Sequence, residues 1–288
     1  MAAEARASAS VVVLSPQNEV LMVQRTRTSS YPSALVFPGG NLDGQDGAVA
    51  ERHEDGPAYR HAAVRECFEE TGILLAVGRN GDRLALSQEE TETARRRVHA
   101  GEVRFSDWLE TVGAEVDTDG LIPFTRWITP AFMPRRFTTQ MYLHLLPLDG
   151  PTPSPSSDGG KENTAVTFCS PTTILSRVAT GQAIVFPPQY YLLHLLSDHV
   201  EATSPAEGRK RLLTDLPHND MVICPRPMGK RPDGRLILAL DDPGVSELRA
   251  SGRKGDTRRI LLVDFAAAAA AGPTGLEVRQ RRGEGAFL

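Results

Sequence analysis

The chain has 288 residues, of which 40% are hydrophobic and 24% charged, the composition of a globular protein that buries a sizeable core. Its formal net charge of −4 excludes the general electrostatic attraction of a basic chain to nucleic acid. No apolar run approaches the ~18 residues of a membrane-spanning helix. The three cysteines, Cys67, Cys169 and Cys224, fit neither a disulfide framework nor a metal-ligand spacing. We therefore expect an intracellular protein that is not secreted and binds neither nucleic acid nor membrane.

The first part of the chain predicts a β-hairpin and a strand that leads into a glycine pair. Residues 11–14 and 20–24 are β-rich runs on either side of the turn-forming sequence SPQNE. Residues 35–37 are expected to form a strand that ends in FPGG. Gly39 and Gly40 lack a Cβ atom, so backbone amides there can approach an anionic ligand closely.

Charged residues and a long insertion flank this glycine pair. Arg25 and Arg27 follow the hairpin, where they could hold a substrate phosphate or remain solvated loop charges. Residues 41–56 are rich in Gly, Asp and Glu and are expected to form a loop that acts as a lid or specificity element.

Residues 57–71 are predicted to form a helix. Pro57 suits the first turn, Asp55 is the candidate N-cap, and Gly72 suits the left-handed position that ends many helices. One row of side chains at helical spacing is expected to face the core: Tyr59, Ala63 and Cys67.

The same helix carries three carboxylates on one face. Glu66 lies three positions before Glu69 and four before Glu70, so their side chains are neighbours that repel one another. A hard divalent cation such as Mg²⁺ takes oxygen ligands, bridges to phosphate and removes this conflict. The alternative is a solvated acidic face. We favour a metal site because the pattern RE-x-x-EE-x-G rarely arises by chance.

The middle of the chain predicts one strand and one or two helices before a proline-rich segment. Residues 73–77 are apolar enough for a strand, and residues 87–109 have broken helical periodicity. Arg95, Arg96 and Arg97 are expected to be exposed. Three apolar residues of this region are expected to pack in the core: Phe105, Trp108 and Leu109.

Residues 140–146 are expected to form a strand, and a basic-aromatic segment precedes it. Arg135 and Arg136 could hold a phosphate while Phe137 stacks on a base. The alternative is a charged strand entry with a core Phe.

The last third of the chain combines a loop, two helices and several strands. Residues 150–160 are rich in Pro, Ser and Gly and predict a mobile surface loop, after which Glu162 is a candidate metal ligand or base. Strands are predicted at 166–169, 235–240 and 259–263, and helices at 172–179 and 189–200. The expected organisation is a disordered segment 1–9, a main domain 10–200 with a helical region 87–112, an extension 201–265 packed on that domain, and a disordered tail 266–288.

The segment from the glycine pair to the end of the acidic helix resembles the signature of the Nudix hydrolases, G-x5-E-x7-RE-U-x-EE-x-G-U, where U is a bulky apolar residue. Gly40 matches the opening glycine, residues 65–70 the central part, and Gly72 with Ile73 the close.

One departure separates the chain from this signature. Eleven residues are inserted between Gly40 and Arg65, and Pro57 stands eight positions before Arg65, where the family has Glu. Glu54 or Asp55 could take that place.

Further segments are similar to one Nudix branch, the peroxisomal coenzyme A diphosphatases of the nineteenth-member type. They are LDGQD after FPGG, RWITP followed by RRF-x-T, and FPPQYYLLHLL at residues 186–196. The branch has RRFDT where this chain has Thr138 after Phe137, so an acidic residue is lost. The similarity extends over residues 11–196.

The resemblance implies an α/β fold, the Nudix α/β/α sandwich with a mixed β-sheet, here with an inserted loop and helical region and a small C-terminal β-rich extension. It implies a Mg²⁺- or Mn²⁺-dependent hydrolase with Glu66, Glu69 and Glu70 as metal ligands. Glu66 or Glu69 would take the proton of the attacking water, with Glu162 as a third candidate. Arg65 would steady the ligands by pairing with Glu69. The candidate substrate-binding residues, from the residues themselves and from the resemblance together, are Gly39, Gly40, Arg25, Arg135, Arg136 and Phe137.

The branch implies coenzyme A or an acyl-CoA as substrate, cut to phosphopantetheine and adenosine 3′,5′-bisphosphate. The alternatives are another diphosphate, such as ADP-ribose, NADH or a prenyl diphosphate, and a Nudix module that binds a nucleotide without cleaving it. Ala286-Phe287-Leu288 is a poor match to a peroxisomal Ser-Lys-Leu signal, so the expected compartment is cytoplasmic or peroxisomal. The sequence leaves the oligomeric state open.

Overall fold

The chain is built around a mixed β-sheet. The structure is a computed structural model that describes residues 4–26, 32–81, 84, 86–158, 163–200, 204–215, 221–265 and 272–281. The strand order of the sheet is β10-β7-β8-β1-β2-β3, while β4 pairs with β1 and β9 with β2. The strands are β1 (Arg6–Leu14), β2 (Val20–Arg25), β3 (Leu35–Val36), β4 (Gly39–Asn41), β7 (Ile122–Ile128), β8 (Phe137–Leu145), β9 (Asn163–Cys169) and β10 (Val222–Ile223).

Strand β1 lies at the centre of this sheet. It pairs in parallel with β8 from Arg6 to Leu14, and with β4 and β2 on its other edge. The predicted hairpin of β1 and β2 is confirmed. The prediction of disorder is wrong for Arg6–Ala9, because the neighbouring strands β8 and β4 take up their backbone hydrogen bonds.

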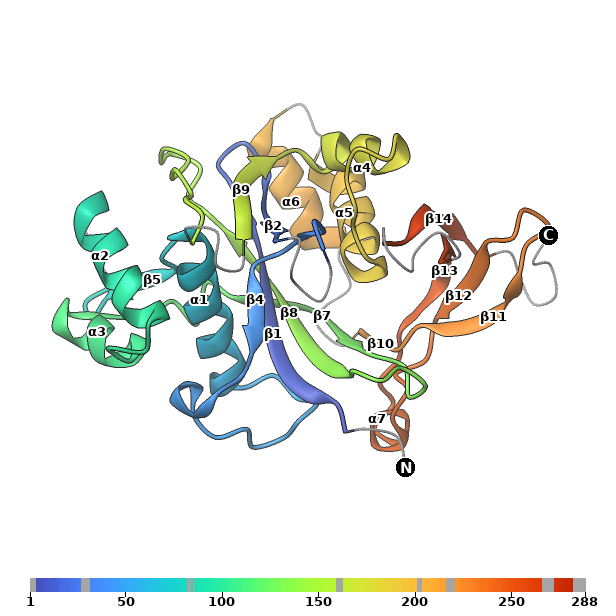
Figure 1. Cartoon of the computed structure of the whole chain (residues 1–288), viewed down its shortest axis with the longest axis horizontal. Helices are drawn as coiled ribbons and strands as arrows, with labels where there is room; N and C mark the ends of the chain where they lie inside the picture. The colour runs from blue at the N-terminus through green and yellow to red at the C-terminus, as the bar shows by residue number, and fades with distance from the viewer. Residues whose placement is uncertain are drawn as a thin grey trace.

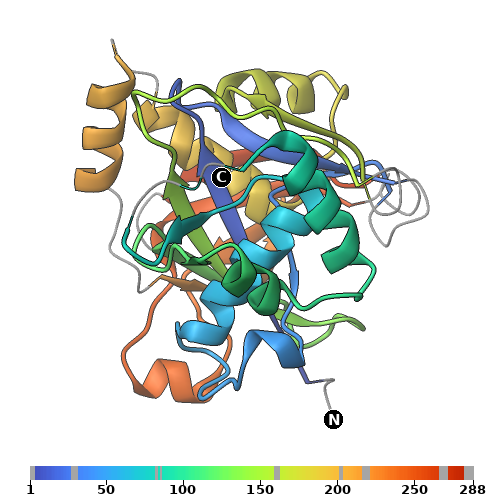
Figure 2. The same cartoon turned by 90° about the vertical axis from the view of Figure 1, so that its left-hand side faces the viewer.

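Helices cover both faces of the sheet. Successive side chains of β1 point to opposite faces, and its apolar residues therefore join a core on each side. Val11 and Val13 join a core with α1, whereas Val12 and Leu14 join a core with α5. Figures 1 and 2 show α1, α2 and α3 on one side and α4, α5 and α6 on the other. The helices are α1 (Pro57–Thr71), α2 (Gln88–His99), α3 (Phe105–Thr111), α4 (Pro171–Ala179), α5 (Pro187–Val200) and α6 (Pro205–Asp215). The predicted α/β/α sandwich with a mixed sheet is confirmed.

The part of the sequence between β4 and β7 contains α2 and α3, which confirms the predicted helices. Phe105, Trp108 and Leu109 are buried as expected. The predicted strand at 73–77 lies slightly later, as β5 (Ala76–Gly78), which pairs with β6 (Ala114–Val116). Among the described residues, we find no helix with the length and apolar character needed to cross a membrane.

The C-terminal part forms a second sheet in the order β11-β12-β13-β14. Its strands are β11 (Arg226–Lys230), β12 (Leu236–Leu240), β13 (Asp256–Asp264) and β14 (Thr274–Gln280), and the short helix α7 (Ser246–Ala250) lies between β12 and β13. Leu238, Leu261 and Leu276 share one apolar core with Leu192 of α5. The predicted disordered tail is wrong for β14, whose backbone pairs with β13. The helix α6 was not predicted.

Candidate active site

The helix α1 positions the acidic residues. Pro57 is its first residue, as predicted, and Gly72 ends it in the left-handed conformation, with φ of 73° and its amide bonded to the Phe68 carbonyl at 2.9 Å. The predicted cap is wrong, since Gly56 occupies the N-cap position and no side chain caps the helix. Asp55 instead accepts hydrogen bonds from Arg60 and Tyr142. The predicted core row of Tyr59, Ala63 and Cys67 is buried.

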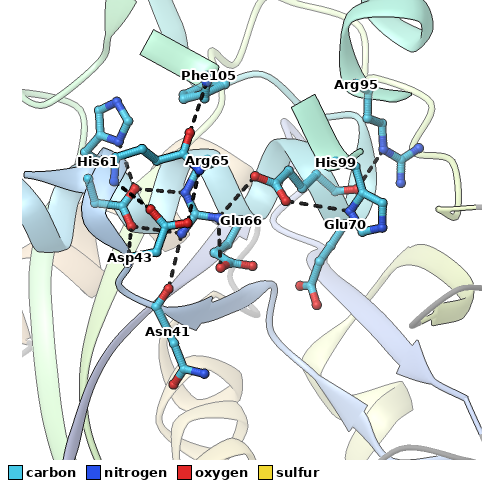
Figure 3. Close-up of polar contacts among 12 residues, drawn as sticks. Asn41, Asp43, His61, Arg65, Glu66, Glu70, Arg95, His99 and Phe105 are labelled. Atoms are coloured by element: carbon cyan, nitrogen blue, oxygen red, sulfur yellow. Dashed lines mark hydrogen bonds and ion pairs between the residues drawn. The ribbon is translucent and has the colours of Figure 1, made fainter. Parts of the chain in front are cut away.

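Arg65 is the centre of a buried ionic network on α1 (Figure 3). Its Nε and Nη2 donate to the two carboxylate oxygens of Asp46 at 2.8 and 2.9 Å, a bidentate pair. Nη1 donates to Glu69 Oε1 at 3.1 Å and lies 3.0 Å from Glu66 Oε1. Nη2 also donates to the Asn41 carbonyl at 3.2 Å. The predicted Arg65–Glu69 contact is confirmed, but Asp46 is the dominant partner.

Asp46 was missed as a site residue. It ends a short 3-10 helix (Gly44–Asp46), and its carboxylate also accepts from the backbone amide of Asp43 at 2.9 Å and lies 3.0 Å from His61 Nδ1. Burial by itself would raise the pKa of Asp46. The hydrogen bonds from Arg65 and His61 and the positive charge of Arg65 outweigh burial and hold this pKa below its ordinary value.

Asp46 also explains the apparent departure from the Nudix signature. It is the sixth residue after Gly40, which is the place of the first acidic residue when the signature is counted from its opening glycine. The eleven extra residues therefore follow this acidic position. Glu54 and Asp55 do not take its place, since Glu54 pairs with Arg253 at 2.5 Å and Asp55 pairs with Arg60. Counting from Gly40 would have identified Asp46.

The carboxylates of Glu66 and Glu70 lie beside the strand β4. The Gly39 amide donates to Glu70 Oε2 at 3.0 Å, so this glycine orients a carboxylate of the acidic helix. A Cβ atom on Gly40 would overlap the Glu66 carboxylate, and a Cβ atom on Gly39 would overlap the backbone of Ala9 in β1. The glycine pair therefore lets β4 pass directly over the acidic helix.

Burial and neighbouring carboxylates make Glu66 and Glu70 hard to ionise. Burial raises the pKa of Glu66 to about 7, although Arg65 opposes the shift. Burial and then the charge of Glu66 raise the pKa of Glu70 to about 8, while Gly39, Asn163 and Arg25 act in the opposite direction. A positive charge between them would stabilise both ionised forms. The oxygen donors match those of a hard divalent cation.

Glu69 is held differently, by α2. Its carboxylate accepts from Arg65 and lies 3.6 Å from His99 Nδ1, and its backbone carbonyl accepts from Arg95 Nε at 2.9 Å. The prediction that Arg95 is exposed is wrong. Arg95 is only 3% exposed, because its guanidinium also bonds to Ser156 at 2.8 Å in the segment before β9. Within the described ranges, no three acidic, His or Cys side chains already form a complete metal-ligand group.

The predicted substrate residues separate into two places. Arg25 is close enough to Glu70 to lower its pKa. Phe137 pairs with Arg6, three positions along β1 from Ala9, the partner of Gly40, which is roughly 10 Å along the strand. Arg135 and Arg136 lie in the connection before β8, where Arg136 donates to the Thr129 carbonyl at 3.1 Å. Arg27 and Glu162 lie outside the described residues.

Comparison with known proteins identifies Nudix hydrolases that are similar to this chain. The family model of the NUDT19 Nudix domain matches residues 47–196. The chain is similar to nudix hydrolase 7 of Caenorhabditis elegans, at 30% identity over 67% of this chain and 60% of that protein. It is also similar to the acyl-coenzyme A diphosphatase NUDT19 of Xenopus laevis, at 27% identity over 62% of this chain and 59% of that protein. The chain thus spans about 60% of the length of the curated relatives that it matches.

The fold is also shared with a solved structure. A crystal structure of a Nudix hydrolase from Alicyclobacillus acidocaldarius has a TM-score of 0.56 and 26% sequence identity, and covers 68% of this chain and 92% of that chain. The region matched by the family model contains α1 with Glu66, Glu69 and Glu70, and the strands β7, β8 and β9 of the main sheet. The chain belongs to the Nudix family, in the group described by the NUDT19 Nudix domain.

Proposed function

We propose that the chain is a divalent-cation-dependent diphosphatase that cleaves coenzyme A or an acyl-CoA. The observation that carries this proposal is the pair of neighbouring carboxylates, half-buried Glu66 and buried Glu70, next to the glycine strand β4. The substrate is supported by the name of the Xenopus relative, an acyl-coenzyme A diphosphatase. In the reaction, the oxygen of water bonds to one phosphorus and the bridging P–O bond breaks. The products are adenosine 3′,5′-bisphosphate and phosphopantetheine, which keeps its acyl group when the substrate is an acyl-CoA.

The carboxylates of Glu66, Glu69 and Glu70 would hold Mg²⁺ or Mn²⁺. When bound, the ion neutralises charge on the diphosphate and acidifies the attacking water. Gly39 aims the Glu70 carboxylate, and Arg65 aligns Glu66 and Glu69 from the other side.

The side chain of Glu66 suits the role of proton acceptor. Its carboxylate lies between Gly40 and Arg65, where it would accept a proton from water held at the acidic face. Glu69 is the alternative, but it is engaged by Arg65 and lies next to His99.

The segment of Arg135, Arg136 and Phe137 would contact the nucleotide half of the substrate. Its place roughly 10 Å along β1 from Gly40 suits the far end of a nucleotide rather than the diphosphate itself. The two guanidinium groups match a ribose phosphate, and the ring offers a stacking face for adenine.

Mass spectrometry of products tests this proposal. The purified chain is incubated with Mg²⁺ and a pool of CoA, an acyl-CoA, ADP-ribose, NADH, a nucleoside triphosphate and a prenyl diphosphate. We expect metal-dependent phosphopantetheine and adenosine 3′,5′-bisphosphate, and no products from the Glu70→Gln variant. Cleavage of another member would overturn the substrate and keep the reaction. No cleavage of any member would overturn the enzymatic proposal.

A further inference from the structure

Two polar side chains beside Glu70 have hydrogen-bonding groups without partners. Arg25 of β2 and Asn163 of β9 are cross-strand neighbours in the sheet. Asn163 is only 1% exposed. Within the described chain, its Oδ1 and Nδ2 atoms and the Nε atom of Arg25 are buried and make no hydrogen bond. An unpaired buried polar group costs about 1–3 kcal/mol, so this arrangement is not explained by stability.

Arg25 and Asn163 lie next to the acidic site. The Asn163 carboxamide and the charge of Arg25 are close enough to the Glu70 carboxyl to lower its pKa, but the unpaired atoms of the two side chains lie outside hydrogen-bond geometry with it. The Glu70 carboxylate is itself fixed by the amide of Gly39. The Glu70 carboxylate at the end of α1 is therefore surrounded by hydrogen-bond donors from three strands, β2, β4 and β9.

The chemistry of these groups selects an anion. Arg25 carries a positive charge that disfavours a second cation at the same point. A guanidinium N–H and a carboxamide N–H are the donors that proteins use for phosphate oxygens. The remaining Asn163 oxygen can accept from a water molecule, several of which Mg²⁺ retains when it binds to carboxylates.

We propose that Arg25 Nε and Asn163 Nδ2 form a binding site for one phosphate group of the diphosphate, next to Glu70. This inference rests on the proposed function, since it names the contacts that the diphosphate makes beyond the carboxylates. Asn163 then acts as a substrate-binding residue, and its lack of protein partners is the cost of that role.

Thermal unfolding without ligand gives the first test. Asn163→Leu keeps the size of the side chain and removes both unpaired atoms, so we expect a melting temperature equal to or above that of the wild type. Gln140→Leu is the matched control. Gln140 is also buried, but its Nε2 donates to the Met141 carbonyl at 3.0 Å, so this variant should melt at a lower temperature. A drop for Asn163→Leu as large as that of the control would indicate a structural role and overturn the proposal.

Calorimetric binding of methylenediphosphonate in the presence of Mg²⁺ gives the second test. We expect the wild type to bind this uncleavable diphosphate, and Asn163→Leu and Arg25→Gln each to bind it about tenfold more weakly, the effect of one lost hydrogen bond. Asn163→Asp should bind still more weakly, because it adds a negative charge. The affinity of each Asn163 variant for Mn²⁺ alone should not fall.

Three outcomes would overturn the proposal. They are no binding of the diphosphonate to the wild type, equal binding by wild type and Asn163→Leu, and loss of Mn²⁺ affinity in Asn163→Leu with recovery in Asn163→Asp. The last would make Asn163 a cation ligand. If the wild type cleaves CoA and Asn163→Leu binds the diphosphonate as tightly as the wild type, only this inference fails. If no substrate is cleaved but diphosphonate binding depends on Asn163, only the proposed function fails.

Discussion

The two sides of the acidic helix differ in how their polar groups are paired. On one side, Arg65 donates to Asp46, Glu69 and Asn41, and Asp46 also accepts from the backbone. On the other side, Glu70 accepts from Gly39, while Arg25 Nε and both polar atoms of the Asn163 side chain lack hydrogen bonds in the described part of the chain. Both regions are buried, so the contrast does not come from solvent.

This difference distinguishes a region that supports the fold from a region that binds a ligand. A buried network with paired groups holds its members in one geometry, whereas a buried group without a partner is costly and is retained where a ligand uses it. The Arg65 network therefore fixes the position of α1, and the Glu70 side offers the contacts for an ion and a diphosphate. The following substitutions, in order of decreasing expected effect, test this contrast.

Glu70→Gln should cause the largest loss of activity with little loss of stability. The loss of several kcal/mol of charge stabilisation corresponds to about a thousandfold lower kcat. The neutral amide removes a buried carboxylate whose pKa is raised to about 8, so the free energy of unfolding should not decrease. Steady-state kinetics with the cleaved substrate and urea denaturation measure the two effects. Retained turnover would remove Glu70 from the site.

Arg65→Met should cause the largest loss of stability. It leaves Asp46, whose side chain has no exposed surface, without its guanidinium partner, and breaking a buried pair in this way costs about 3–5 kcal/mol. Urea denaturation measures the change. Arg79→Met is the control, because Arg79 pairs with Glu110 at 3.2 Å on the exposed surface and should be nearly neutral. Equal midpoints for the two variants would refute a supporting role for the Arg65 network.

Gly40→Ala should reduce activity more than stability. The new methyl group overlaps the Glu66 carboxylate, and because this is the end of a flexible side chain, Glu66 can move away while the fold persists. A displaced catalytic group lowers kcat by about 10- to 100-fold. Gly44→Ala is the control, since its added methyl group has open space around it. The prediction is wrong if both variants retain wild-type kcat.

Asp46→Asn should show the smallest effect, one that depends on pH. The amide oxygen can still accept from Arg65, and the charge of Arg65 stays paired with Glu66 and Glu69. The pKa of Asp46 is lowered in the folded chain, so its ionised form stabilises the fold above the unfolded-state pKa of about 3.9. This contribution is lost as the pH falls through the lower folded-state value. Wild type and variant should therefore differ most at pH 7, and the difference should shrink as the pH falls below the unfolded-state pKa of about 3.9. Urea denaturation across this range measures the difference, and a gap that is constant with pH would contradict the prediction.

The local features of the site could be read from the sequence because they depend on spacing alone. The limits of α1 followed from Pro57 and Gly72, and its core row from helical periodicity. The Arg65–Glu69 contact followed from a four-residue separation. The hydrophobic run of β1 was predicted, but the distribution of its alternate side chains between two cores was not.

The long-range features could not be read in this way. Asp46 is 19 positions before Arg65, beyond a loop whose length hid the match. Arg95 lies within an arginine triplet that indicates a solvated face, and only the packing of α2 on α1 shows that it is buried. Asn163 belongs to no motif, and its importance arises from the pairing of β9 with β2.

The affinity for Mn²⁺, measured by electron paramagnetic resonance, tests the central claim most directly. The titration compares the wild type, Glu70→Gln and Glu110→Gln, a control at an exposed carboxylate. We predict that Glu70→Gln binds Mn²⁺ at least about tenfold more weakly than the other two proteins, while all three remain equally folded. Equal affinity in all three proteins would contradict the assignment of the ion to the Glu70 side of the helix.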